Sequence, residues 1–139
     1  MRIKLSIVKG FQTKEIKAWS QQHLSEGSTV ISDGLACFNA VVDAGCLHDR
    51  IVCGGVRASV EEPEFYWINT ILGNLKSSLR STYHAIRPKY AQRYLSEFQY
   101  RFNRRFNLCD LIPRLAYVAL RTAPMPEKLL KIGFRLGGN

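Results

Sequence analysis

The alternation of strand-like and helical segments in residues 1–62 is the feature that most constrains the fold. Strands are predicted at residues 2–8, 28–32 and 50–53. The first alternates polar and apolar residues, and the other two are short β-branched runs that stop at Asp33-Gly34 and Gly54-Gly55. Helices are predicted between them, over residues 13–24 with Thr13 as a cap and over residues 35–44 with a left-handed Gly45 at the end. This order is typical of an α/β layered domain.

From residue 64 onward the pattern becomes helical. Helices are predicted over residues 64–80, 88–105, 110–122 and 128–132. No internal repeat or linker-like stretch marks a domain boundary, so we expect a single domain over residues 1–139. Within it, residues 1–62 form the strand and helix part of the sheet, residues 63–123 a helical basic part, and residues 124–139 a tail.

Basic residues are concentrated in the second half of the chain. Residues 76–139 hold 13 Lys and Arg against 3 Asp and Glu, whereas residues 1–75 hold 7 against 8. The net charge of +9 makes a polyanion the first partner to consider, with nucleic acid ahead of an anionic membrane surface. No apolar run approaches the roughly 20 residues of a membrane span, and the first residues lack the apolar core of a signal peptide. We therefore expect a cytoplasmic, nucleoid-associated protein without a membrane partner.

The helix predicted over residues 64–80 has two distinct faces. Six apolar residues share the face that we expect to be buried: Trp67, Ile68, Ile71, Leu72, Leu75 and Leu79. Opposite them, Asn69 and Lys76 are nearly two turns apart, so both point in one direction at about 10 Å along the axis. Spacing alone leaves open whether this pair belongs to a site or to an ordinary solvated face.

Asp33 lies where a short apolar strand gives way to Gly34. Ligands of α/β sheets bind at the carboxyl ends of strands, so this carboxylate could bind a divalent cation. The alternative is a turn residue, or the N-cap of the helix that follows.

The helix predicted over residues 88–105 combines aromatic and basic side chains. Tyr90, Tyr94, Phe98 and Phe102 recur at four-residue spacing, which favours a core stripe over a base-stacking platform. Residues 76–105 carry eight basic residues and one acidic residue, whereas a solvated face normally mixes both signs. We therefore predict contacts with the phosphate backbone. The candidate DNA-binding residues are Lys76, Arg80, Lys89, Arg93, Arg101, Arg104 and Arg105.

Four runs of the sequence resemble one protein family. They are VISDGLACF at 30–38, FYWINTILGNLK at 65–76, TYH at 82–84 and YLSEFQYRFNRR at 94–105. In order and separation they are similar to the C-terminal part of the ISXO-two-like insertion-sequence transposases, which belong to the DDE type. The resemblance covers about residues 2–130. It implies an α/β fold, namely a truncated ribonuclease-H-like (integrase-like) domain followed by C-terminal helices.

The resemblance also implies roles for three residues. Asp33 takes the place of the second catalytic aspartate, Asn69 that of the third acidic position, and Lys76 that of the lysine two turns later. Such enzymes hold two Mg²⁺ ions, for which Asp33 and the Asn69 carboxamide oxygen would be ligands. A neutral Asn is a weaker ligand than Glu, so Mg²⁺ would be poorly bound. Lys76 would hold a DNA phosphate near the metals.

One part of the family pattern has no counterpart in this sequence. In the family, the first catalytic aspartate and an N-terminal zinc-ribbon portion both lie upstream of the strand that corresponds to residues 2–8. We therefore expect a truncated or remnant copy, or one piece of a split reading frame, whose strand edges need another chain. The expected partners are double-stranded DNA (transposon ends and target), a second copy of the chain, and a complementing N-terminal transposase fragment.

Two functions follow from this interpretation. The first is DNA transposition, in which the chain is the C-terminal part of a cut-and-join transposase. Completed by the missing strands, it would be a Mg²⁺-dependent polynucleotidyl transferase. The alternative is a non-catalytic DNA-binding remnant. A small basic RNA-binding protein is a third possibility, but the sequence lacks the aromatic signature and GXXG loop of common RNA modules.

Overall fold

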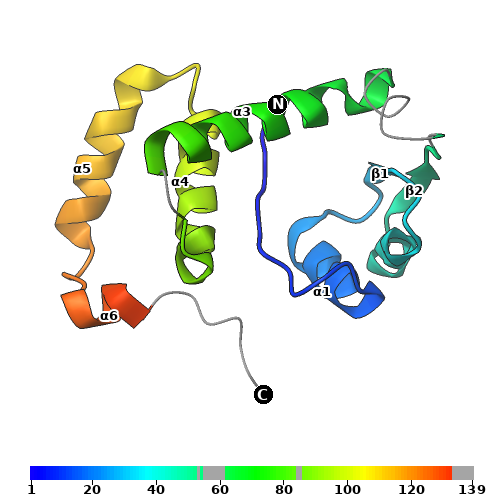
Figure 1. The fold of residues 1–139 in the computed structure, drawn as a ribbon, viewed down its shortest axis with the longest axis horizontal. Helices are drawn as coiled ribbons and strands as arrows, with labels where there is room; N and C mark the ends of the chain where they lie inside the picture. The colour runs from blue at the N-terminus through cyan, green and yellow to red at the C-terminus, as the bar shows by residue number, and fades with distance from the viewer. Residues whose placement is uncertain (53, 55–61, 84–85, 133–139) are drawn as a thin grey trace. The chain divides into compact units, whose positions relative to one another are not determined.

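The computed structural model describes residues 1–52, 54, 62–83 and 86–132 (Figure 1). The chain divides into two compact units. Val8–Lys76 forms one, called the sheet unit, and Met1–Ile7 together with Ser77–Asn139 forms the other, called the helical unit. Helix α3 (Tyr66–Tyr83) begins in the sheet unit and ends in the helical unit.

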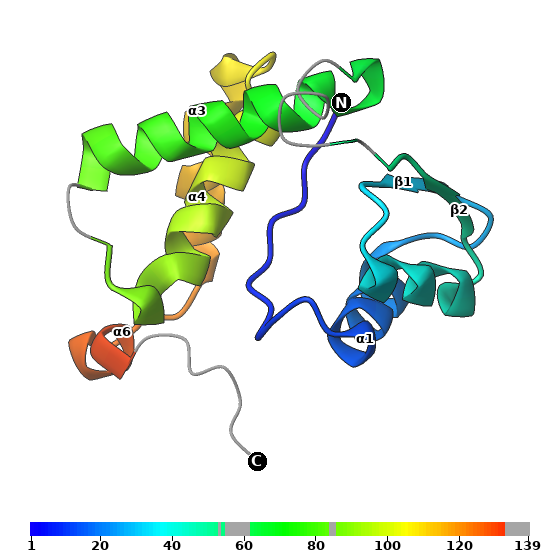
Figure 2. The same cartoon turned by 45° about the vertical axis from the view of Figure 1, so that its right-hand side comes forward.

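The sheet unit is built on two parallel strands, β1 (Thr29–Ser32) and β2 (Leu47–Arg50). Their register pairs Thr29 with Leu47 and Ser32 with Arg50. A 3₁₀ helix, η1 (Ala36–Ala44), connects them, and α1 (Thr13–His23) precedes β1. Figure 2 shows α1 and η1 side by side below the strands. This combination of helix with a small parallel sheet is compatible with the predicted α/β class.

The core of the sheet unit lies where α1 meets η1. Its buried residues are Ile16 from α1, Cys37, Ala40 and Val41 from η1, and Cys46 before β2. Leu24, Val30 and Phe38 pack against this cluster. Gly45 ends η1 in the left-handed conformation with φ of 76°, as predicted, and so turns the chain back toward β2.

Two boundaries in the sheet unit differ from the sequence prediction. The strand expected at residues 50–53 spans Leu47–Arg50 instead, and Cys53 lies outside the described residues. The polar sequence of β2 has little strand propensity, so its pairing with β1 rather than its own pattern decides its position. At the start of α1, Gln12 occupies the cap position without a side-chain hydrogen bond, and Thr13 is the first helical residue.

Helix α3 follows a 3₁₀ turn, η2 (Pro63–Phe65), which places Pro63 at the favoured first position. Its predicted apolar face is only partly buried. Ile71 and Leu75 are each 8% exposed, but Trp67 is 58% and Ile68 is 50% exposed. The expectation of a fully buried face is therefore wrong for the first turns of α3. In the described part of the chain, too few apolar side chains pack on those turns to cover them.

The helical unit contains α3's last turns and three further α-helices. These are α4 (Ala91–Asn103), α5 (Leu111–Arg121) and α6 (Glu127–Ile132), with 3₁₀ turns η3 (Pro88–Tyr90) before α4 and η4 (Leu108–Asp110) before α5. The predicted helices are thus present with boundaries shifted by a few residues. None of the helices in the described ranges is both long and apolar enough to cross a membrane.

Aromatic side chains support the packing of α4. Phe98 is 8% exposed and its ring stacks on that of Phe102 at 6.1 Å between centroids. The ring of Tyr94 lies 4.3 Å from that of Tyr83. Of the four residues of the stripe only Phe98 is buried, and Tyr90, Tyr94 and Phe102 are half-buried, so the stripe packs within the unit but is not the fully buried core that the sequence predicts.

Residues 2–8 do not form the predicted strand. The segment is extended, but its alternate backbone N–H groups donate to side chains of α4 instead of to another strand. Ile3 donates to Asn103 Oδ1 at 2.7 Å, Leu5 to Gln99 Oε1 at 2.7 Å, and Ile7 to Gln92 Oε1 at 3.0 Å. The period-two pattern therefore predicted the extended conformation correctly but not its partner.

Candidate functional site

Asp33 directly follows β1 at the carboxyl edge of the parallel sheet. Gly34 makes the turn with φ of 83°, and a Cβ added there would lie 2.8 Å from Val52 Cγ2. Only glycine fits that position without strain, because it tolerates positive φ and has no side chain to meet Val52. Asp33 Oδ1 accepts a 3.3 Å hydrogen bond from the backbone N–H of Leu35. The turn thus holds an exposed carboxylate at the end of the strand.

Ser32 and His48 join the two strands next to Asp33. The Ser32 hydroxyl is buried and lies 2.9 Å from His48 Nε2. Ser32 Oγ also accepts from the Gly34 N–H at 3.4 Å. Through these two hydrogen bonds, the Ser32 hydroxyl links His48 of β2 to the turn that carries Asp33. Local sequence pattern does not reveal this pair, because the register between the strands is needed to find it.

Asp33 and Asn69 line the same cavity of about 310 Å³ in the sheet unit. Ser32 and Asp33 lie at the end of β1, and α3 contributes Asn69 together with apolar walls from Ile68 and Leu72. The cavity therefore combines an apolar lining with polar groups at one side, as ligand sites commonly do. Lys76 is exposed, lies two turns further along α3, and does not line the cavity.

The cavity lining has little charge. Asp33 has a carboxylate and Asn69 a carboxamide, and these are hard oxygen groups of the kind that divalent cations prefer. Among the described residues, no group of three or more His, Cys, Asp or Glu is placed to hold a metal ion. The cavity thus fits part of the coordination shell of one divalent cation and does not by itself fit two.

Four of the seven candidate DNA-binding residues have partners within the helical unit. Arg101 forms an ion pair with Glu97. Lys89 Nζ donates to the Lys131 carbonyl oxygen at 3.1 Å, and Arg93 Nη1 donates to that of Leu130 at 2.7 Å. Arg105 Nη1 donates to the carbonyl oxygen of Phe102 at 2.8 Å. These contacts tie α4 to itself and to α6, and they reduce the availability of the four cations for phosphate.

The other three candidates have no carboxylate partner among the residues that the structure describes. Lys76 and Arg80 are exposed on α3. Arg104 lies with its guanidinium carbon 3.9 Å from the centre of the Tyr100 ring, a cation–π contact that orients the group without neutralising it. The basic surface therefore depends on fewer residues than the sequence suggests.

Comparison with known proteins identifies the family. Among curated proteins and solved structures, none matches the chain at a significant level. A family model described as the ISXO2-like transposase domain matches residues 1–103. This range includes Asp33, Asn69 and Lys76 and covers most of the described chain. The chain therefore belongs to the ISXO2-like transposase domain family, the same family that its sequence runs resemble.

Proposed function

We propose that the chain forms one side of the metal-dependent strand-transfer site of a transposase with a ribonuclease-H-like fold. Membership of the transposase family supports a role in DNA transposition. The observation that carries the finer proposal is the cavity shared by Asp33 and Asn69. These residues come from the end of β1 and from α3, and the sequence resemblance assigns them to two positions of the family's metal site.

The ligand chemistry favours Mg²⁺ or Mn²⁺ as the cofactor. Both oxygens are hard ligands, and transposases of the DDE type generally use divalent metal. Divalent ions held there would supply activation of the attacking water or 3′-hydroxyl and stabilisation of the leaving oxygen. Asp33 and Asn69 together carry one negative charge, so a further carboxylate from another segment or chain is needed for two ions.

The remaining residues act on the DNA and on the site's surroundings. Ile68 and Leu72 give the cavity an apolar wall on its α3 side. The Lys76 ammonium, on the same helical face as Asn69, holds a phosphate of double-stranded DNA as a point charge. Arg80 and Arg104 also contact phosphate, whereas the four internally bonded basic residues contribute little. The partners are transposon ends and target DNA.

A protein partner is part of the proposal. Several apolar side chains of α5 are exposed, including Ile112 at 74% and Leu120 at 88%. Either a second copy of the chain or a complementing N-terminal segment would cover such side chains. A non-catalytic DNA-binding function is the alternative, and the observation that favours it is the single carboxylate in the cavity.

The decisive experiment measures Mn²⁺ binding and DNA nicking on the same variants. Asp33→Asn should abolish Mn²⁺ binding seen by electron paramagnetic resonance. Asp43→Asn is the matched control, because Asp43 is an exposed carboxylate of the same unit that pairs with Lys17 at 2.9 Å. This control should leave Mn²⁺ binding unchanged.

Nicking is assayed on DNA that carries transposon ends, with Mg²⁺ or Mn²⁺. The chain alone should be inactive, and a separately expressed segment with the upstream strands should restore Asp33-dependent nicking. Nicking that survives Asp33→Asn would contradict the metal-site proposal. DNA binding without nicking in either arrangement would favour the non-catalytic function.

A further inference from the structure

We propose that a second cavity, between α4 and α5 of the helical unit, binds phosphodiester groups of the DNA backbone. The inference rests on the proposed role in transposition and adds a DNA-contact site to it. The cavity measures about 570 Å³ and is lined by Arg2, Arg104 and Arg114 together with polar side chains such as Asn103 and Asn107. Arg104 and Arg114 lie beyond the residues that the family model matches.

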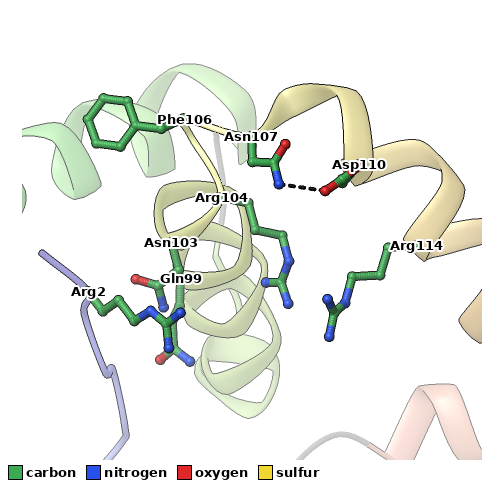
Figure 3. A pocket seen from close by; sticks show the side chains of 8 residues that line it. All are labelled: Arg2, Gln99, Asn103, Arg104, Phe106, Asn107, Asp110 and Arg114. Atoms are coloured by element: carbon green, nitrogen blue, oxygen red, sulfur yellow. Dashed lines mark hydrogen bonds between the residues drawn. The ribbon is translucent and has the colours of Figure 1, made fainter.

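Arg104 and Arg114 reach into the same space from two helices. Figure 3 shows Arg104, at the end of α4, and Arg114, in α5, with their guanidinium groups directed into the opening between these helices. Arg104 stacks on Tyr100, which limits the conformations of its long side chain. Less side-chain entropy is therefore lost when an anion binds.

Arg2 is brought to the cavity by the extended segment at the start of the chain. Its neighbour Ile3 is tied to Asn103 by two hydrogen bonds, from the Ile3 N–H to Oδ1 and from Nδ2 to the Ile3 carbonyl oxygen. Figure 3 shows Arg2 beside Gln99 and Asn103. A residue from the other end of the sequence thus adds a third guanidinium to the cavity.

The cavity has an excess of positive charge that its own acid does not neutralise. Of the described residues in the lining only Asp110 is acidic, and its Oδ2 accepts a hydrogen bond from Asn107 Nδ2. Among the described residues, none of the three arginines forms an ion pair with a carboxylate. Three guanidinium groups against one carboxylate leave a site that favours an anion.

The chemistry of the lining favours phosphate, and the proposed role in transposition favours phosphate within a DNA strand. Guanidinium groups bind phosphate oxygens through paired, charge-assisted hydrogen bonds. A volume of about 570 Å³ falls in the range of sites for whole organic ligands, so a lone phosphate ion would leave it largely unfilled. Successive phosphate and sugar units of a DNA strand fill it and place a phosphate near each arginine.

The test is the salt dependence of binding to a short labelled DNA duplex, followed by fluorescence anisotropy with the full chain. Arg104→Gln and Arg114→Gln should each lower the slope of log Kobs against log salt by about 1, because each variant loses one phosphate contact. Arg121→Gln is the matched control: Arg121 is on the same helix α5, lies over the Tyr117 ring, and does not line the cavity. Its slope should equal that of the wild type.

Three outcomes are informative. Slopes in Arg104→Gln and Arg114→Gln that equal the Arg121→Gln slope would overturn the cavity assignment alone. A wild-type chain that binds no duplex DNA at low salt would overturn both this inference and the DNA partner of the proposed function, whereas Mn²⁺ binding reports on Asp33 separately. Arginine effects confined to an RNA duplex of the same length would overturn the assignment to DNA.

Discussion

Ile3 and Asn103 exchange two hydrogen bonds, one in each direction. The Ile3 N–H donates to Asn103 Oδ1 at 2.7 Å, and Asn103 Nδ2 donates to the Ile3 carbonyl oxygen at 2.9 Å. The side-chain amide thus offers an extended segment the same donor and acceptor that a neighbouring strand would offer. Gln92 makes a similar exchange with the segment, through Ile7 N–H and the Leu5 carbonyl oxygen.

Replacing Asn103 should therefore loosen the N-terminal segment. Asn103→Leu removes both hydrogen bonds while keeping the number of side-chain heavy atoms, and we expect a loss of about 1–2 kcal/mol in the free energy of unfolding, measured with urea. Trypsin should also cleave faster after Arg2 and Lys4. Asn74→Leu is the control, because Asn74 is exposed on α3 and its replacement should change stability by less than about 0.5 kcal/mol. Equal effects of the two variants would contradict a structural role for the exchange.

Gly34 should be more sensitive to substitution than Gly27. Both residues have positive φ, 83° and 76°, but a Cβ on Gly27 would meet nothing within 4 Å, whereas one on Gly34 would meet Val52 Cγ2 at 2.8 Å. Gly27→Ala should cost about 1 kcal/mol from backbone strain alone. Gly34→Ala should lower the free energy of unfolding by clearly more than Gly27→Ala does, and it should also displace Asp33 and weaken Mn²⁺ binding. Urea unfolding of both variants measures the difference. Equal losses in the free energy of unfolding would show that the Val52 side chain moves aside without a measurable energetic cost.

Two buried serines should respond in opposite directions to replacement by alanine. Ser20 is fully buried in α1, and its hydroxyl has no hydrogen-bond partner among the described residues. Ser20→Ala should therefore raise the free energy of unfolding by about 1 kcal/mol, since it removes an unsatisfied hydroxyl. Ser32→Ala removes the hydrogen bond with His48 and should lower the free energy of unfolding by about 1 kcal/mol. Destabilisation by Ser20→Ala would show that its hydroxyl has a partner, such as a bound water.

The free energy of unfolding should fall at alkaline pH because the Tyr83 hydroxyl loses its proton. Burial raises the pKa of the Tyr83 hydroxyl, and the negative charge of Glu97, whose Oε2 accepts a 3.2 Å hydrogen bond from this hydroxyl, raises this pKa further. The unfolded chain therefore loses this proton first, and the stabilisation present below the unfolded pKa of about 10 is lost as pH rises through the folded pKa. Urea unfolding from about pH 8 to pH 11 measures this loss. Tyr83→Phe should make the decline less steep, and an identical decline would exclude Tyr83 as its source.

The sequence was informative where local pattern decides the structure. Asp33 followed by Gly34 marks a turn after a strand, because glycine tolerates the positive φ that the turn needs. The helical period likewise predicts that Asn69 and Lys76 share a face of α3. Both inferences depend on neighbours within two turns, and no distant segment is needed to make them.

Contacts between distant segments were beyond local pattern. The pairing of Ser32 with His48 requires the register of β1 and β2, which the polar sequence of β2 does not signal. Arg2 and Arg114 were not among the candidate DNA-binding residues, because only the packing of α4 brings them to one cavity. The number of basic residues can be counted from the sequence, but most of the groups that bind these residues within the chain cannot be predicted from it. Glu97, the partner of Arg101, is the exception, because it lies four residues earlier on the same helix.

Arg93 should stabilise α6 rather than bind DNA. Its guanidinium donates to the Leu130 carbonyl oxygen at 2.7 Å, and Lys89 and Tyr90 donate to that of Lys131. The last carbonyl groups of a helix have no partner within it, and a cation beside them also opposes the negative end of the helix dipole. A helix as short as α6 depends on such contacts because it is unstable alone.

Arg93→Gln should therefore speed amide hydrogen exchange in Glu127–Ile132 and leave the salt slope of DNA binding near the wild-type value. Arg104→Gln should do the reverse, since Arg104 makes no contact with α6 carbonyls in the described residues. A lower slope with unchanged exchange in Arg93→Gln would instead support the sequence-based prediction that Arg93 contacts phosphate.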